Sequence, residues 1–238
     1  HSRSRRQRQM CIRDRAMIDM FNAMVDEMFD YGRFILKSKR QNPSEDLLSA
    51  IANAKIGDEK LTDEFLDGSW LLIIFAGNDT TRNTMSGGIK LLHENQSQKD
   101  LLMNNLDLLP NFINETVRCV SPVIHMRRTS LEEAEINGQK IGPYEKISLW
   151  YGAANRDPDI FENPDEFNIL RENADKHLAF GIGRHTCLGK PVALMQLKEF
   201  YSQFLTRFKD FEMNGDWKVA PNNFVHAIQE MPIKFTPE

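Results

Sequence analysis

The fold is decided by residues 180–189, which read Phe180-Gly181-Ile182-Gly183-Arg184-His185-Thr186-Cys187-Leu188-Gly189. This stretch places a cysteine in a glycine-rich loop just ahead of a predicted helix. A helix N-terminus stabilises a thiolate, and free backbone N–H groups there can hydrogen-bond to the sulfur. The glycines allow positive φ and let a flat group approach the backbone closely. For a lone cysteine, the alternative is a buried structural role.

The same ten residues follow the spacing Phe-x-x-Gly-x-His-x-Cys-x-Gly, which chance produces about once in 10⁵ chains of this composition. On this motif the chain resembles the cytochromes P450. The resemblance implies a heme b cofactor whose iron is bound axially by the Cys187 thiolate, a ligand that favours O–O cleavage. It also implies that His185 hydrogen-bonds a heme propionate. The remaining motif positions expected around the heme are Phe180, Gly181, Gly183 and Gly189.

A long helix is predicted from Thr62 to about His93, with Thr62 as N-cap and two carboxylates in the first turn. Its middle is apolar all round, which predicts that it crosses the interior of the domain. Within it, residues 76–81 read Ala-Gly-Asn-Asp-Thr-Thr and match the family's Ala-Gly-x-(Asp/Glu)-Thr-Thr.

The resemblance assigns this helix motif to oxygen activation. Gly77 would leave room for dioxygen beside the heme contact Ala76, and Thr80 would hydrogen-bond dioxygen or a water beside it. Asp79 would relay protons from solvent. A helix kink with capped polar groups is the alternative.

Glu115 and Arg118 lie three residues apart and match the family's Glu-x-x-Arg. The composition alone predicts about one accidental match, so this motif supports the resemblance only because it stands at the expected place in the order of motifs. An exposed helix pair worth about 0.3–0.5 kcal/mol is the alternative. The resemblance instead implies a pair buried behind the heme, with a third basic member in the following meander. Glu166 stands where that arginine is expected, and Arg171 is the candidate substitute.

Two further groups of residues are assigned by the resemblance. Arg128 aligns with a strand arginine that contacts a propionate, while Arg127 beside it could be confused with it, and an exposed strand arginine is the alternative for either. Substrate contacts are expected from Ile73 and Ala76, from Val123 and Ile124, and from the C-terminal turn at 224–227, which includes Phe224 and Val225. These residues are mostly apolar, which is compatible with a hydrocarbon chain.

Periodicity and turn signals predict a mainly α chain with a small β region. Residues 155–176 are expected to be ordered coil, and an Asn137-Gly138 hairpin turn is expected. The other predicted elements are helices at 16–39, 46–54, 100–105, 110–120 and after 189, a polar connector at 57–62, strands at 123–130 and 147–151, and short strands and turns at 211–238.

The first fifteen residues differ from the rest, because they carry six arginines and one aspartate. We expect residues 1–15 to be a non-native sequencing or assembly artefact and residues 16–238 to be part of one P450 domain. The resemblance runs from about Ser44 to the C-terminus in the family's order of motifs. It implies the C-terminal half of a bacterial P450, which we expect to hold heme poorly without the N-terminal part.

Composition excludes several classes of protein. A formal charge of −4 gives no nucleic-acid signal, and no apolar run reaches the roughly 18 residues of a membrane span. Three cysteines, Cys11, Cys119 and Cys187, are too few for a disulfide framework, which indicates a reducing, cytoplasmic compartment.

Among bacterial P450s, the chain is most similar to the alkane terminal hydroxylases, with the cholesterol side-chain hydroxylases as runner-up. This resemblance is carried by the stretches GNDTTRNTMSGG at 77–88, HMRRTS at 125–130, GAANRDPDIFENPDEF at 152–167 and KHLAFGIGRHTCLG at 176–189. The resemblance implies a monooxygenase that takes electrons from a ferredoxin and its reductase and uses dioxygen to hydroxylate an apolar small molecule. A basic patch for the ferredoxin is expected at Arg184, Lys190 and Lys198. The alternatives of another class are a metal or nucleophilic site at His185 and Cys187, and a heme- or metal-binding protein without oxygenase activity.

Overall fold

The computed structural model describes the backbone of residues 2–208 and 210–236, and the side chains from Arg15 onward. The chain divides into two compact units, one up to Ala76 and one from Gly77 onward, so that the boundary falls within helix α3, Asp63–Glu94. Helices dominate, and every sheet is an antiparallel pair of strands. The mainly α fold with a small β region is confirmed. In the described part of the chain, no helix is both long and apolar enough to cross a membrane.

The first unit contains the N-terminal elements. Its predicted first helix is present, but the backbone helix continues back to Ser2, through the stretch that we excluded from the fold. The segment predicted as a polar connector forms a tight hairpin, in which Lys55 pairs with Lys60, so this prediction is wrong. The elements are α1 Ser2–Gln41, α2 Leu47–Asn53, β1 Lys55–Ile56, β2 Glu59–Lys60 and the first turns of α3.

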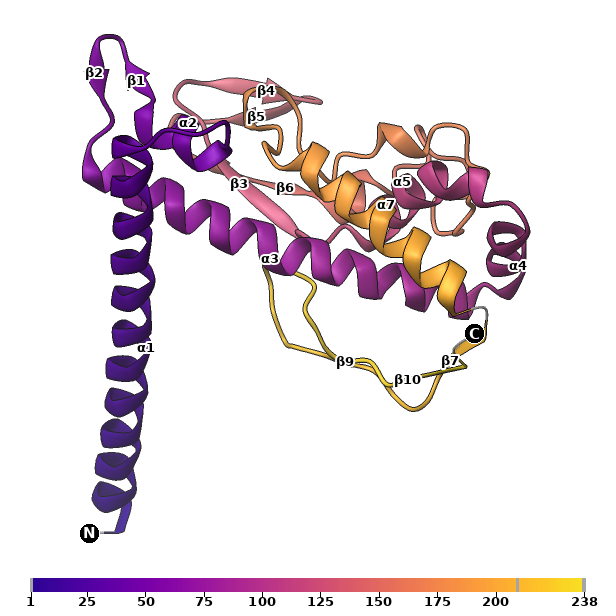
Figure 1. The fold of residues 1–238 in the computed structure, drawn as a ribbon, viewed down its shortest axis with the longest axis horizontal. Helices are drawn as coiled ribbons and strands as arrows, with labels where there is room; N and C mark the ends of the chain where they lie inside the picture. The colour runs from indigo at the N-terminus through magenta and orange to yellow at the C-terminus, as the bar shows by residue number, and fades with distance from the viewer. Residues whose placement is uncertain (1, 209, 237–238) are drawn as a thin grey trace. The chain divides into compact units, whose positions relative to one another are not determined.

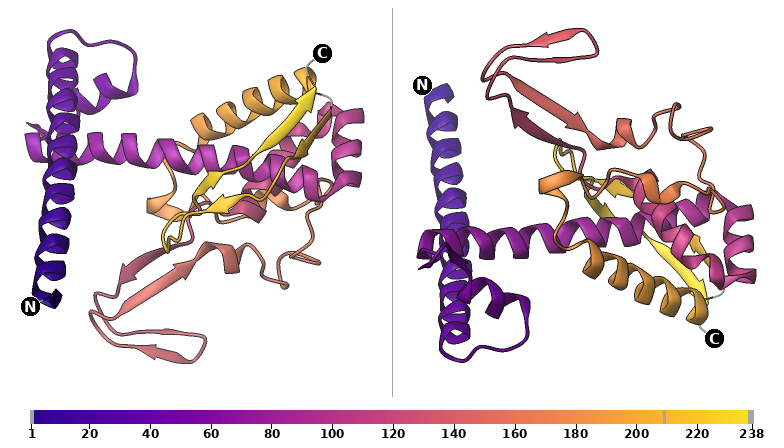
Figure 2. Two further views of the ribbon diagram at one scale, coloured as in Figure 1. Left: turned by 90° about the horizontal axis from the view of Figure 1, so that it is seen from below. Right: turned by 90° about the horizontal axis from the view of Figure 1, so that it is seen from above.

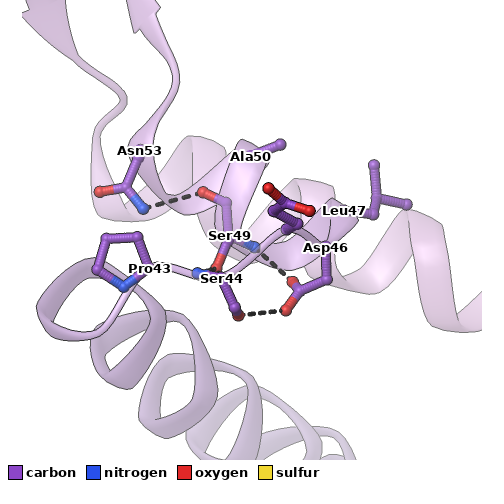
Figure 3. A pocket seen from close by; sticks show the side chains of 8 residues that line it. Pro43, Ser44, Asp46, Leu47, Ser49, Ala50 and Asn53 are labelled. Carbon is purple, nitrogen blue, oxygen red and sulfur yellow. Dashed lines mark hydrogen bonds between the residues drawn. The ribbon is translucent and has the colours of Figure 1, made fainter.

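The first unit is held by a small core in which Trp70 is 5% exposed and donates its indole N–H to the carbonyl of Met28 at 3.0 Å. Beside α2 lies a shallow surface hollow (Figure 3). There, Asp46 caps the helix by accepting the Ser49 N–H at 2.8 Å, and it pairs with Lys39. The hydrogen bond from Lys39 lowers the pKa of the Asp46 carboxyl below its usual range. This hollow holds none of the predicted site residues.

The second unit begins within α3 and packs α3, α5 and α7 against one another (Figure 1). The β3–β6 pair leads into the β4–β5 hairpin (Figure 2), whose turn residues Asn137 and Gly138 both have positive φ, as predicted. The helical elements are α4 Gln96–Asn104, η1 Leu106–Leu108, α5 Leu109–Val120, α6 Tyr151–Ala154, η2 Ala174–Lys176, η3 Gly183–His185 and α7 Lys190–Arg207. The strands are β3 His125–Thr129, β4 Ala134–Ile136, β5 Gln139–Ile141, β6 Lys146–Trp150, β7 Asp210–Met213, β8 Lys218–Val219, β9 Ile228–Glu230 and β10 Ile233–Thr236.

The core of the second unit depends on a close approach between α3 and α7. A Cβ at Gly88 would overlap the hydroxyl of Tyr201, so only glycine fits there. The Tyr201 side chain is fully buried, and its hydroxyl donates to the carbonyl of Thr84 at 2.8 Å. Its ring packs edge-on against Phe112 of α5, with 4.8 Å between centroids. Tyr201 of α7 therefore contacts both α3 and α5.

The prediction that the middle of α3 crosses the interior is wrong for residues 71–78, which are exposed except for the half-buried Ile73. Leu72 is 65% exposed and Ile74 is 43% exposed. The helix is present as predicted, but the described residues bury it on either side of this stretch, at Leu66 and Trp70 and again at Ile89 and Leu92.

Candidate functional site

The cysteine loop is built by main-chain hydrogen bonds between its two arms. The N–H of Cys187 donates to the carbonyl of Phe180 at 2.8 Å, and the N–H of Gly181 donates to the carbonyl of Leu178 at 2.8 Å. Gly181 and Gly183 have φ of +71° and +70°, a conformation that disfavours any other residue type. The predicted glycine loop is therefore present, and it holds the cysteine backbone in place.

The Cys187 side chain is exposed, so the alternative of a buried structural cysteine is wrong. Two apolar neighbours in the same loop are also exposed, Ile182 at 75% and Leu188 at 76%. An accessible thiol flanked by apolar side chains suits a flat, largely apolar group with one metal atom to bind. Within residues 15–208 and 210–236, no group of three or more His, Cys, Asp or Glu side chains gathers at a metal-binding spacing.

The two predicted propionate contacts stand on different elements. His185 is exposed in η3, two residues before the cysteine. Arg128 is half-buried on β3 and pairs in register with Ile147 of β6, while its guanidinium donates to the carbonyl of Arg127 at 3.0 Å. Arg127 is the more exposed of the two arginines.

Glu115 and Arg118 form a fully buried ion pair, so the exposed-pair alternative is wrong. Both side chains are 0% exposed. The guanidinium donates two hydrogen bonds to the carboxylate, from Nε to Oε2 at 2.7 Å and from Nη2 to Oε1 at 2.8 Å. The third member is Arg171, whose Nε lies 3.1 Å from Oε1 of Glu115. A buried charge needs such partners, because removing one leaves the other uncompensated.

Glu166 takes part in this cluster through its backbone instead of its side chain. Its carbonyl accepts one hydrogen bond from Arg118 and one from Arg171, each at 3.0 Å, while its side chain points to solvent. The glutamate at this position therefore does not disturb the cluster, since no side chain is required there.

Burial and charge set the titration of this region. Burial opposes the charge of Arg118, yet the hydrogen bond and charge of Glu115 raise its pKa above the ordinary value. Burial, followed by the Glu115 charge, raises the pKa of the Cys119 thiol to about 11, so this second cysteine stays a thiol. Burial, followed by the Lys190 charge, lowers the pKa of His177 to about 4.

Asn155 joins the buried ion cluster to the cysteine loop, a role that sequence reasoning missed. It is 0% exposed, and its carbonyl accepts from Arg118 at 2.8 Å. Its side chain accepts the Leu178 N–H at 2.6 Å and donates to Ser121 at 2.8 Å. The only signal in the sequence is an asparagine at the start of a long coil, which is also typical of a turn.

On α3, Asp79, the predicted proton relay, forms an ion pair with Arg82, which sequence reasoning also missed. Asp79 Oδ1 lies 2.6 Å from Nη2 of Arg82, and both side chains are partly exposed. Gly77 faces open space, since a Cβ built there would meet nothing within 4 Å. Between α3 and α7 lies a hollow lined by Gly77, Asn78, Thr81, Arg82, Met85, Gln196, Glu199 and Phe200.

Four of the predicted substrate residues meet at one place, although a hundred residues separate them in the sequence. Val123 and Val225 form an antiparallel bridge, and the N–H of Ile124 donates to the carbonyl of Phe224 at 2.8 Å. Val225 is itself buried, at 6% exposure, whereas Val123, Ile124 and Phe224 are half-buried. Ile73 and Ala76 lie on the part of α3 that belongs to the first unit.

Comparison with known proteins gives consistent matches. The family model described as Cytochrome P450 matches residues 90–236. Linalool 8-monooxygenase of Pseudomonas putida is 34% identical over 90% of this chain and 53% of its own length, and Steroid C26-monooxygenase of Mycobacterium tuberculosis is 36% identical over 87% and 56%. The solved structure of Cytochrome P450-153 from Novosphingobium aromaticivorans matches with a TM-score of 0.84 and 34% identity, over 93% of this chain and 55% of that one. The chain spans about half the length of the curated relatives that it matches.

Proposed function

The chain belongs to the cytochrome P450 family, and from that premise we propose that it is the heme-binding part of a monooxygenase acting on an apolar small molecule. Proteins of this family bind heme through a cysteine thiolate. The observation that carries the proposal is the exposed Cys187 in a loop whose backbone is fixed by hydrogen bonds and by two glycines of positive φ.

The residues of the loop fit a heme. Sγ of Cys187 would bind the heme iron, and the apolar side chains of Ile182 and Leu188 would lie beside a largely apolar cofactor. His185 and Arg128 would hold the propionates by charge-assisted hydrogen bonds. When bound, the heme supplies the redox chemistry of dioxygen.

The proposed reaction consumes dioxygen, two electrons and two protons, and it yields one hydroxylated product and one water. On this chain, Asp79 would take protons from solvent and pass them toward Thr80, one residue along the helix. Arg82 holds the Asp79 carboxylate at the protein surface, where it can exchange protons with water.

We propose terminal hydroxylation of an alkane or fatty chain as the reaction, because the motif stretches are most similar to those of the alkane terminal hydroxylases. The apolar side chains of Ile73, Val123, Ile124 and Phe224 are compatible with such a chain but do not select among apolar substrates. Steroid side-chain hydroxylation is the second candidate, and it is favoured by the similarity to a steroid C26-monooxygenase. The similarity to a linalool 8-monooxygenase supports the use of linalool as a third probe substrate.

A ferredoxin and its reductase are proposed as the electron donors. Arg184 lies in the cysteine loop and Lys198 lies on α7, and both are exposed, whereas Lys190 is half-buried with its Nζ 5.5 Å from the centre of the Phe180 ring. Lys198 and Arg184 would therefore make the larger contribution to an acidic partner, and Lys190 a smaller one.

The proposal is tested by reconstituting the chain with hemin, reducing it under carbon monoxide and recording the Soret band. We expect the red-shifted band of thiolate ligation in the wild type and in Cys119→Ser, and its loss in Cys187→Ser. Heme uptake by this chain alone is expected to be low, so the position of the band is the readout and not its height. The same red-shifted band in Cys187→Ser would refute the proposal.

A further inference from the structure

The turn at residues 224–227, which carries two of the proposed substrate contacts, is anchored on one side by main-chain hydrogen bonds. The N–H of Ile124 donates to the carbonyl of Phe224, and the N–H of His226 donates to the carbonyl of Pro122, each at 2.8 Å. Both bonds join the turn to the segment that follows α5. They fix the turn along that segment and do not tie it to α3.

The tie to α3 is made by Asn83. The Ile228 N–H, at the start of β9 and directly after the turn, donates to Oδ1 of Asn83 at 2.7 Å. At the other end of the same side chain, Nδ2 donates to the carbonyl of Asp79 at 2.8 Å. One side chain therefore joins the C-terminal turn to the residue proposed to relay protons.

Asparagine at this buried helix position would lower the stability of the fold if its side chain were not hydrogen-bonded at both ends. It is a poor helix former, because its side chain competes for backbone hydrogen bonds, and Asn83 lies deep inside a 32-residue helix at 1% exposure. An unpaired amide at such a site would cost free energy, yet both of its ends are bonded. By contrast, the neighbouring Thr84 is also buried and donates its hydroxyl only to the carbonyl of Thr80, at 2.8 Å.

We propose that Asn83 is a positioning residue that fixes the substrate-facing turn relative to the Asp79 segment of α3. The amide links one element that would touch substrate with one that would deliver protons, and it does so without touching either reactant. The consequence for substrate rests on the proposed function, whereas the tether itself does not. Loss of the tether should loosen the turn and weaken substrate binding, and the cysteine ligand should be unaffected.

One substitution separates the two ends of the amide. Asn83→Thr keeps a donor to the carbonyl of Asp79, as Thr84 does for Thr80, but it cannot reach the Ile228 N–H. Thr84→Val is the matched control, because it removes a buried hydroxyl one residue away and leaves the tether intact.

The first measurement is amide hydrogen exchange of the full chain without heme, resolved to Ile228. We expect exchange to be about tenfold faster in Asn83→Thr and unchanged in Thr84→Val, since one hydrogen bond of this kind corresponds to about that factor. If Ile228 is equally protected in Asn83→Thr and in the wild type, the tether is refuted.

The second measurement is the spectral titration of the heme-loaded chain with linalool, n-dodecane and cholesterol. In Asn83→Thr we expect at least one dissociation constant to rise about tenfold while the carbon monoxide band keeps its thiolate position. Accelerated exchange with unchanged affinities for all three probes would refute the link to substrate. Absence of the thiolate band in the wild type would instead refute the proposed function and leave the exchange result standing.

Discussion

Three acidic side chains in this chain have an arginine three residues later, and two of these pairs, Glu115–Arg118 and Asp79–Arg82, lie in opposite environments. Glu115 and Arg118 are 0% exposed. Arg171 also pairs with the Glu115 carboxylate, and main-chain carbonyls accept the remaining hydrogen bonds of Arg118. Asp79 and Arg82 have nearly the same separation but are 43% and 62% exposed. Identical spacing therefore gives a structural anchor in one region and a water-accessible acid in the other, and burial decides which.

The largest expected effect follows from breaking the buried pair. Glu115→Gln leaves Arg118 and Arg171 without a counter-charge, so the free energy of unfolding should fall by about 3–5 kcal/mol. Denaturant unfolding of the full chain measures this loss. The matched control is Glu94→Gln, which removes an exposed pair with Lys90 and should cost less than about 1 kcal/mol. Equal losses for the two variants would contradict the contrast between the regions.

The buried region should also show a pH dependence that comes from His177. Because its pKa is about 4 in the folded chain against an ordinary 6.5, the unfolded chain takes up a proton first as the pH falls. This contribution is complete above pH 6.5 and should be lost on acidification toward pH 4, by about 3 kcal/mol. The difference in unfolding free energy between wild type and His177→Gln, measured across this range, isolates the effect. A difference that does not vary with pH would contradict it.

In the exposed region the expected effect is on turnover and not on stability. Asp79→Asn removes the proposed proton relay, so turnover of the heme-loaded protein should fall by about 10²-fold, while the free energy of unfolding should change by less than about 0.5 kcal/mol. Substrate oxidation and denaturant unfolding are measured on the same preparation. A loss of stability comparable to that of Glu115→Gln would show that Asp79 is also structural.

The smallest effect is expected for Arg82→Gln. This arginine makes a solvent-screened contact, so its removal should change the free energy of unfolding by less than about 1 kcal/mol, and high salt should shrink the change further. Arg118→Gln, measured beside it in the same unfolding experiment, should cost several kcal/mol whatever the salt concentration. If Arg82→Gln lowered the free energy of unfolding by an amount that did not depend on salt, Arg82 would behave like the buried pair, and the contrast would be contradicted.

Local pattern predicted the cysteine loop, the long helix, the Asn137-Gly138 turn and the Glu115–Arg118 pairing, because each depends on residues close together in the sequence. Periodicity could not show that Leu72 is exposed, since a helix repeat does not reveal which face another segment covers. It also could not show the hairpin of only two residue pairs between Lys55 and Lys60.

Apart from the Asp79–Arg82 pair, the contacts that sequence reasoning missed share one property. Asn155 and Asn83 accept hydrogen bonds from backbone N–H groups of distant segments, and Arg118 donates to the distant carbonyl of Glu166. A backbone N–H or carbonyl is present at almost every residue, so the sequence carries no mark of which one is used. Only the three-dimensional arrangement shows these contacts.

The carbonyl of Glu166 has a consequence for sequence searches. Because the two guanidinium groups bond to main chain there, any side chain that keeps the local backbone in place would preserve both hydrogen bonds. A search pattern that insists on arginine at that site would therefore miss this chain, in which the third basic member stands five positions later, at Arg171.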